Sequence, residues 1–142
     1  MRAWGCWSVG MALVLATGLT AWAQEAAQQI AWRSDLDAAW HSTKSDQKLL
    51  LVYVKADNCL YCEKMERVSY GDPQVTRLIS EAYVPASLHA TRQPELARKM
   101  GVQAFPTTVV IDSDGQLLDA VQGYVPPTKF AQWLKTLTAR RK

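Results

Sequence analysis

The chain has 142 residues, of which 49% are hydrophobic and 20% are charged, and its formal net charge is +3. This composition is typical of one folded globular domain and excludes disordered and collagenous chains. Three cysteines in this length are too few for a disulfide-dense scaffold, and their odd number suggests that one stands apart. The basic stretch Arg140-Arg141-Lys142 is short and lies at the end of the sequence, so no nucleic-acid partner is predicted.

Residues 1–23 have the pattern of a secretory signal peptide. One positive charge, at Arg2, precedes an apolar centre, and small residues at Ala21 and Ala23 precede the expected cut. The alternative is an uncleaved membrane anchor, but a bilayer span needs about 20 apolar residues, and glycine and threonine interrupt this centre. We therefore expect cleavage near Ala23, removal of Cys6, and a periplasmic or secreted chain with no stable membrane insertion.

After the predicted cut, residues 24–33 form a short polar leader, and residues 34–142 form the domain. A helix is predicted over residues 35–44, with Ser34 as a plausible N-cap. The continuous apolar run of residues 49–54 predicts a strand that is covered on both faces. Periodicity, caps and turn residues predict further helices over 60–69, 73–82, 94–100 and 127–139, and further strands over 83–89, 107–111 and 117–121.

The order of these elements predicts an α/β fold with a mixed sheet. Strands that alternate with helices early in the chain are expected to be parallel. The last two strands are joined by Asp112-Ser113-Asp114-Gly115, which predicts a hairpin turn and therefore an antiparallel pair. We expect a central sheet of four to five strands with helices on both faces.

Cys59 and Cys62 form a C-x-x-C pair where the buried strand gives way to a helix. The free N–H groups of a helix N-terminus stabilise a thiolate, so Cys59 is the expected attacking sulfur and Cys62 the resolving one. A purely structural disulfide remains an alternative, although so small a loop constrains the unfolded chain little. A zinc site is less well supported, because only His41 and His89 remain as ligands at poor spacing.

These features resemble the thioredoxin superfamily over about residues 36–137. The resemblance is carried by Cys59-Leu60-Tyr61-Cys62 and its preceding strand, by Phe105-Pro106-Thr107, by the predicted hairpin and by Gly123. It implies a thioredoxin fold in which a cis peptide bond places Pro106 opposite the cysteine pair. It also implies disulfide exchange with protein thiols or disulfides, without a bound metal, flavin or nucleotide. The residues from Cys62 to Glu66 resemble those of exported, single-domain thioredoxin-like proteins.

The chain also departs from the thioredoxin pattern at the motif. Asn58 stands where thioredoxins have a tryptophan, Leu60-Tyr61 replaces Gly-Pro, and Tyr53 replaces a buried acid that assists proton transfer to the second cysteine. Glu66, one helical turn after Cys62, is a candidate replacement for that acid. The alternatives are a solvated Glu66 that pairs with a neighbouring side chain (Lys64 or Arg67), and a local acid at Asp57.

The sequence thus predicts a thiol–disulfide oxidoreductase that acts outside the cytoplasm through Cys59 and Cys62, with contributions from Pro106 and Glu66. The spacing does not encode the direction of electron flow. A reductase would need a membrane electron-transfer partner, and an oxidase would need an oxidant. The alternative is a redox-inert binding or chaperone-like module that has a structural disulfide and recognises extended peptides.

Overall fold

The apolar run predicted to be a doubly covered strand is the central strand β1 (Leu49–Lys55) of the computed structural model, which describes residues 29–141. β1 pairs in parallel with β2 (Tyr83–His89) and antiparallel with β3 (Thr107–Ile111). β4 (Leu117–Gln122) pairs antiparallel with β3, so the strand order is β2-β1-β3-β4. The predicted mixed sheet is confirmed, and it has four strands.

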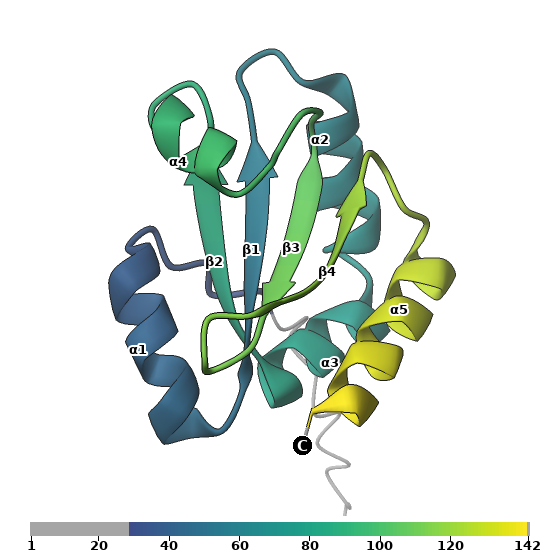
Figure 1. Ribbon diagram of the computed structural model, residues 1–142. Coiled ribbons are helices and arrows are strands. Elements are labelled where there is room, and N and C mark those ends of the chain that lie inside the picture. The colour runs from purple at the N-terminus through teal and green to yellow at the C-terminus, as the bar shows by residue number, and fades with distance from the viewer. Residues whose placement is uncertain (1–28, 142) are drawn as a thin grey trace, which may run out of the picture.

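Helices cover both faces of this sheet (Figure 1). α1 (Leu36–Asp46) and α4 (Pro94–Lys99) lie on one face. The other face carries α2 (Leu60–Lys64), the π-helical turn η1 (Met65–Ser69), α3 (Pro73–Ala82) and α5 (Pro127–Arg140). Among residues 29–141, no helix is both long enough and apolar enough to cross a membrane.

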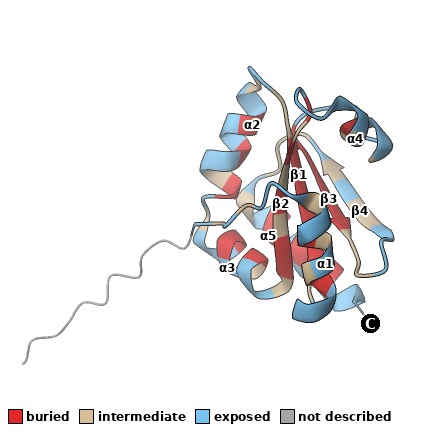
Figure 2. Ribbon diagram, turned by 90° about the vertical axis from the view of Figure 1, so that its left-hand side faces the viewer, coloured by how far each residue is buried: buried red, intermediate tan, exposed pale blue. Residues whose placement is uncertain are grey.

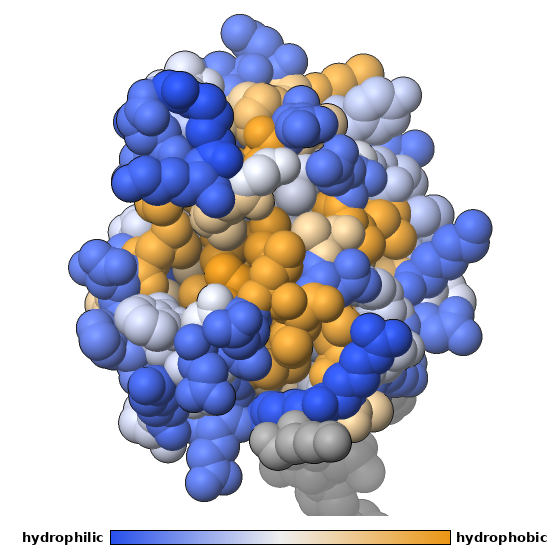
Figure 3. All heavy atoms as spheres, viewed as in Figure 1, coloured by the Kyte–Doolittle hydropathy of each residue, from blue (hydrophilic) through white to orange (hydrophobic). Residues whose placement is uncertain are grey.

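The side chains of β1 divide between two hydrophobic clusters, because successive residues of a strand point to opposite faces. Leu49, Leu51 and Tyr53 pack with α3 and α5, whereas Leu50 and Val52 pack with α1 and α4. Figure 2 shows the buried strands between exposed outer helix surfaces, and Figure 3 shows apolar atoms over the middle of the α1 and α4 face. The continuous apolar run therefore follows from burial on both sides.

The helix starts show how local capping sets element boundaries. α1 is capped by Asp35, whose carboxylate accepts from the Ala38 N–H at 3.0 Å, so the prediction of Ser34 as the cap was wrong. The carboxylate of Asp72 accepts from the backbone N–H groups of Gln74 and Val75, as expected for the cap of α3. A carboxylate and a hydroxyl can both accept this bond, so the backbone geometry decides which residue caps the helix.

The predicted helix over residues 60–69 changes its winding halfway. The first five residues form α2, and the next five form η1, in which the Tyr70 N–H donates to the Met65 carbonyl at 2.9 Å. The chain then passes Gly71, where an added Cβ atom would lie 2.4 Å from the carbonyl oxygen of Arg67. Periodicity alone does not distinguish an α-helix from one π-helical turn.

The last residues of the predicted leader lie against the sheet. Arg33 forms a bridge with Ala86 on the outer side of β2, with hydrogen bonds of 3.0 and 2.8 Å. Trp32 packs on Tyr53 and Tyr70, with ring centroids 5.4 and 4.8 Å away. The predicted signal peptide and Cys6 lie outside the described residues.

Candidate active site

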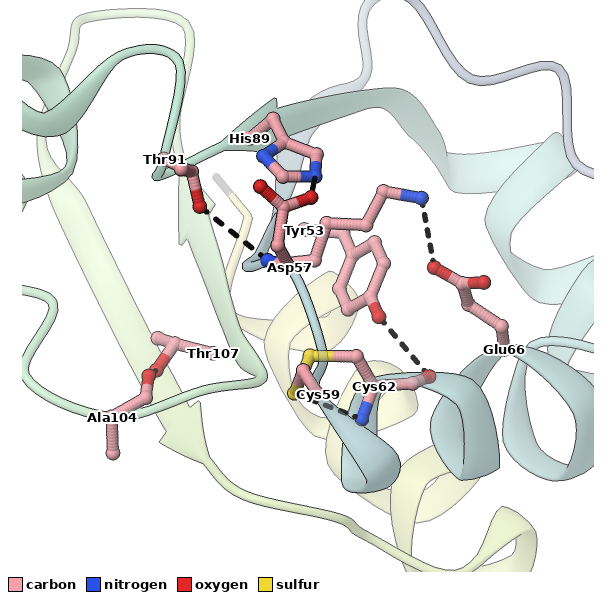
Figure 4. The surroundings of a disulfide bond; sticks show 10 residues. Tyr53, Asp57, Cys59, Cys62, Glu66, His89, Thr91, Ala104 and Thr107 are labelled. Carbon is pink, nitrogen blue, oxygen red and sulfur yellow. Dashed lines mark hydrogen bonds and ion pairs between the residues drawn. A yellow bond between two sulfur atoms is a disulfide. The ribbon is translucent and has the colours of Figure 1, made fainter.

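Cys59 and Cys62 are joined by a disulfide bond at the start of α2 (Figure 4). Cys59 is the N-cap residue of α2, and its sulfur accepts from the backbone N–H of Cys62 at 3.2 Å. Cys59 is partly exposed, whereas Cys62, a buried residue of α2, has 3% of its surface exposed. One sulfur is therefore within reach of a partner, and the other is shielded.

The loop before Cys59 is held by contacts with the end of β2. Asn58 has a φ of +52°, a left-handed conformation that asparagine tolerates better than most residues. One carboxylate oxygen of Asp57 lies 3.2 Å from Nε2 of His89, and the Asp57 N–H donates to the Thr91 hydroxyl at 3.4 Å. Asp57, the alternative candidate for a local acid, thus pairs with His89 rather than with the cysteine pair.

Pro106 lies at the same edge of the sheet as the cysteine loop. The peptide bond between Phe105 and Pro106 is cis, and Thr107 is paired with Val54 near the end of β1. The Pro106 carbonyl accepts from the Gly123 N–H at 2.6 Å. In Figure 4 the segment from Ala104 to Thr107 lies on one side of the disulfide and Glu66 on the other.

Glu66 forms a tertiary ion pair that no sequence spacing indicated. Its carboxylate lies 2.9 Å from Nζ of Lys55, the last residue of β1. Lys64, a predicted helix neighbour, instead lies over the ring of Tyr124 at 4.4 Å. The side chain of Glu66 is 41% exposed. Glu66 is therefore neither isolated in solvent nor paired within its own helix.

Tyr53 joins β1 to the cysteine helix from inside the protein. Its side chain is 1% exposed, and its hydroxyl donates to the carbonyl of Cys62 at 3.3 Å. Burial raises the pKa of Tyr53 far above its ordinary value, and the nearby charge of Glu66 raises it further. The phenol is thus neutral and can donate at any pH at which thiols exchange. The sequence comparison indicated only that Tyr53 replaces a buried acid. The inward-facing position of Tyr53 on β1 could also have indicated that its hydroxyl lies at the site.

A pocket of about 670 Å³ opens beside Tyr53. Its lining includes Trp32, Tyr53, Lys55, Glu66 and Tyr70. Water in the pocket therefore has access to the Lys55–Glu66 pair. Across the described residues, no three side chains of His, Cys, Asp or Glu gather in a way that could hold a metal ion.

Comparison with known proteins shows the family to which this arrangement belongs. The family described as a thioredoxin-like domain matches residues 36–138. A disulfide bond formation protein of Brevibacillus choshinensis is 30% identical over 131 residues, which cover 88% of this chain and 89% of the relative. The thiol:disulfide interchange protein DsbD of Photorhabdus laumondii is 26% identical over 100 residues, which cover 67% of this chain. The match spans 17% of that DsbD.

Solved structures confirm the predicted thioredoxin fold. A thioredoxin from Thermus thermophilus matches with a TM-score of 0.69 and 25% identity, covering 77% of this chain and 87% of the thioredoxin. The oxidised C-terminal domain of Neisseria meningitidis DsbD matches with a TM-score of 0.63 and 24% identity. That match covers 75% of this chain and 98% of the DsbD domain.

Proposed function

Because this chain belongs to the thioredoxin-like domain family, we propose that it is a thiol–disulfide oxidoreductase that exchanges disulfides with protein partners through Cys59 and Cys62. The observation that carries the proposal is the unequal exposure of the two cysteines, with Cys59 partly exposed and Cys62 only 3% exposed. An attacking sulfur must reach a partner, whereas a resolving sulfur needs only to reach Cys59. The names of the relatives, disulfide bond formation and thiol:disulfide interchange proteins, agree with this chemistry.

The reaction consists of two exchange steps. In the first, the thiolate of Cys59 attacks one sulfur of a partner disulfide, forms a mixed disulfide, and releases the other partner sulfur as a thiolate. In the second, Cys62 loses its proton and attacks the Cys59 sulfur, which closes the Cys59–Cys62 disulfide and releases the remaining partner sulfur. Both released thiolates take up protons. Two electrons pass to the partner, and the reverse sequence oxidises a partner dithiol.

The backbone around Cys59 supports its role as the attacking sulfur. The Cys62 N–H points at the Cys59 sulfur at 3.2 Å, and a hydrogen bond of this kind stabilises a thiolate more than a thiol. Cys62 is less exposed than Cys59, so a partner sulfur reacts with Cys59. The pair thereby has a fixed order of reaction.

Pro106 and three apolar side chains are proposed to bind the partner. Among the described residues, Leu60, Tyr61, Phe105 and Leu117 are the exposed large hydrophobic side chains. The first two belong to the first turn of α2, and Phe105 directly precedes Pro106. An extended partner segment would place apolar residues on this rim, and backbone groups near Pro106 would pair with its main chain.

Glu66 is proposed to take up the proton that Cys62 loses in the second step. Its carboxylate comes one turn after Cys62, pairs with Lys55, and lines the open pocket. A positioned carboxylate in contact with water can accept a proton and later release it to solvent. In this role Glu66 replaces the acid that the chain lacks at position 53.

The proposed compartment is the cell envelope. The signal-peptide pattern of residues 1–23 supports export. In that compartment a reductase would draw electrons from a membrane electron-transfer partner. The equilibrium potential against glutathione distinguishes the directions: a value near about −270 mV favours a reductase, and one near about −120 mV favours an oxidant.

Insulin reduction with a thiol donor tests the proposed function. We expect turnover by the wild-type protein, none by Cys59→Ser, and a trapped mixed disulfide with Cys62→Ser. Alkylation of the reduced protein at neutral pH should modify Cys59 first. If the wild type and Cys59→Ser are equally inactive and Cys59 resists alkylation, the chain is a redox-inert module with a structural disulfide.

A further inference from the structure

Tyr53 lies between the disulfide and Glu66, and its phenol ring points toward the cysteine helix (Figure 4). It reaches this place from β1, on the face of the sheet that carries α2 and η1. The hydroxyl donates to the carbonyl of Cys62 at 3.3 Å, which is long for a hydrogen bond between two oxygen atoms. Its single proton is therefore only weakly held by this acceptor.

The charge of Glu66 acts on the same hydroxyl. Burial is the main reason why the pKa of Tyr53 is raised, and the negative charge of Glu66 adds to that increase. A carboxylate near a phenol attracts the hydroxyl proton when it is ionised and ceases to do so when it is protonated. The phenol hydroxyl is thus influenced by two acceptors. The Cys62 carbonyl has a fixed charge distribution, whereas the charge of the Glu66 carboxylate can change.

From this arrangement we propose that Tyr53 is a positioning residue that transmits the charge state of Glu66 to Cys62. The inference rests on the proposed function, since it concerns the resolving step of the same exchange. While Glu66 is ionised and paired with Lys55, as in this structure, its charge competes for the Tyr53 proton, and the bond to the Cys62 carbonyl is long at 3.3 Å. Once Glu66 has taken up the proton lost by Cys62, that competition ends, and the bond tightens and holds the cysteine in the geometry of the closed disulfide.

The other charged and titratable groups around this cluster face other partners or solvent. Tyr53 is therefore the residue that links Glu66 to Cys62. Lys55, on β1, is paired with Glu66 itself. The Tyr70 hydroxyl is bonded to the Thr108 hydroxyl at 2.7 Å. At the end of β2, His89 faces Asp57. On the cysteine helix, Lys64 lies over Tyr124, and Arg67 is an exposed side chain of η1.

The pocket places this link away from the proposed partner surface. It opens beside Tyr53 and Glu66, whereas the segment from Ala104 to Thr107 lies across the disulfide from Glu66 (Figure 4). A partner bound over Cys59 and Pro106 would cover the latter side and leave the pocket open to water. Glu66 can then exchange its proton with solvent while the mixed disulfide is still in place.

The test compares Tyr53→Phe with Tyr83→Phe in the full chain. The Tyr83 hydroxyl is also buried and also donates to a backbone carbonyl, that of Leu134 at 2.7 Å, but it belongs to no part of the site. The readout is the single-turnover rate of disulfide closure as a function of pH. We expect Tyr53→Phe to slow closure by about three- to tenfold, the loss of one hydrogen bond, and Tyr83→Phe to leave it unchanged.

Glu66→Gln in both backgrounds shows whether the two residues act together. If Tyr53 transmits the charge, Glu66→Gln shifts the pH profile in the wild type and shifts it less in Tyr53→Phe. An equal shift in both backgrounds overturns the inference. A wild-type protein without exchange activity would refute the proposed function instead, so the two failures are distinguishable.

A second measurement avoids any change at Tyr53. Protein labelled with ¹³C at the tyrosine Cζ atoms reports the hydrogen bonding of each hydroxyl by NMR. Glu66→Gln is expected to move the Tyr53 signal and its pH dependence while leaving the Tyr83 signal in place. An unmoved Tyr53 signal would overturn the inference even if Tyr53→Phe proved too unstable to assay.

Discussion

Nζ of Lys55 lies 2.9 Å from Oε1 of Glu66, so the last residue of β1 neutralises the acid that follows Cys62 by one turn. Both side chains keep more than a third of their surface exposed. The contact joins the sheet to the cysteine helix beside the open pocket. It therefore sets the electrostatic surroundings of the proposed proton acceptor without closing it off from water.

Glu66→Gln should change the pH profile of disulfide exchange and leave stability nearly unaltered. The variant removes the proposed proton acceptor, whereas an exposed ion pair contributes only about 0–1 kcal/mol to stability. Lys55→Gln is the matched variant: it breaks the same ion pair but keeps the carboxylate, so its pH profile should change less than that of Glu66→Gln. An unshifted profile in Glu66→Gln would return Glu66 to an ordinary surface residue.

Trp32→Ala should lower the free energy of unfolding by about 2 kcal/mol. The indole packs edge to face on Tyr70 and tilted against Tyr53, and a partly buried aromatic residue loses both area and ring contacts when truncated. Urea unfolding measures the change, and Gln29→Ala, an exposed position in the same segment, serves as the control. Equal stability of the two variants would mean that residues 30–33 are a dispensable leader.

Gly71→Ala should destabilise the fold by about 2–3 kcal/mol, because the new Cβ atom would meet the Arg67 carbonyl oxygen at 2.4 Å. A backbone oxygen cannot move away from the new Cβ atom as a flexible side chain can. Gly101→Ala is the comparison, since that glycine has a φ of +71° but nothing within 4 Å of an added Cβ atom. It should cost about 1–2 kcal/mol, the strain of the left-handed conformation alone. The expectation fails if Gly71→Ala is the milder change.

Stability should fall steeply above about pH 10, the ordinary pKa of tyrosine. Burial is the main cause that raises the pKa of Tyr53, Tyr70 and Tyr83 in the folded protein. Only the unfolded chain then loses these protons, so the contribution is complete below pH 10 and decreases as the pH rises. Three such groups give a slope of up to about 4 kcal/mol per pH unit.

Denaturant unfolding between pH 7 and pH 11 measures this slope. Tyr83→Phe should reduce it by about a third, because one of the three buried phenols is then absent. Every other group that titrates between these pH values is the same in both proteins, so the variant isolates the effect of one tyrosine. A slope that does not depend on Tyr83 would contradict the assignment.

The sequence by itself determined the elements and the position of the redox pair. The continuous apolar run of residues 49–54 predicted β1, and Asp72-Pro73 predicted the start of α3. The last two strands formed the expected hairpin. The pattern C-x-x-C at a strand-to-helix junction placed Cys59 at the helix start and Cys62 one turn below it. These features depend on the conformations and burial of residues that are neighbours in the chain, and periodicity and capping record them directly.

Only the tertiary structure decided which side chains surround the pair. Lys55 with Glu66, Asp57 with His89, and Tyr53 with the Cys62 carbonyl each join different elements. The packing of Trp32 on Tyr70 likewise depends on where the segment before α1 meets β2. Strand order, register and one π-helical turn set these distances, and a shift of one residue in register would turn Tyr53 to the opposite face of the sheet. The sequence therefore located the cysteine pair, and the fold determined which polar groups lie around it.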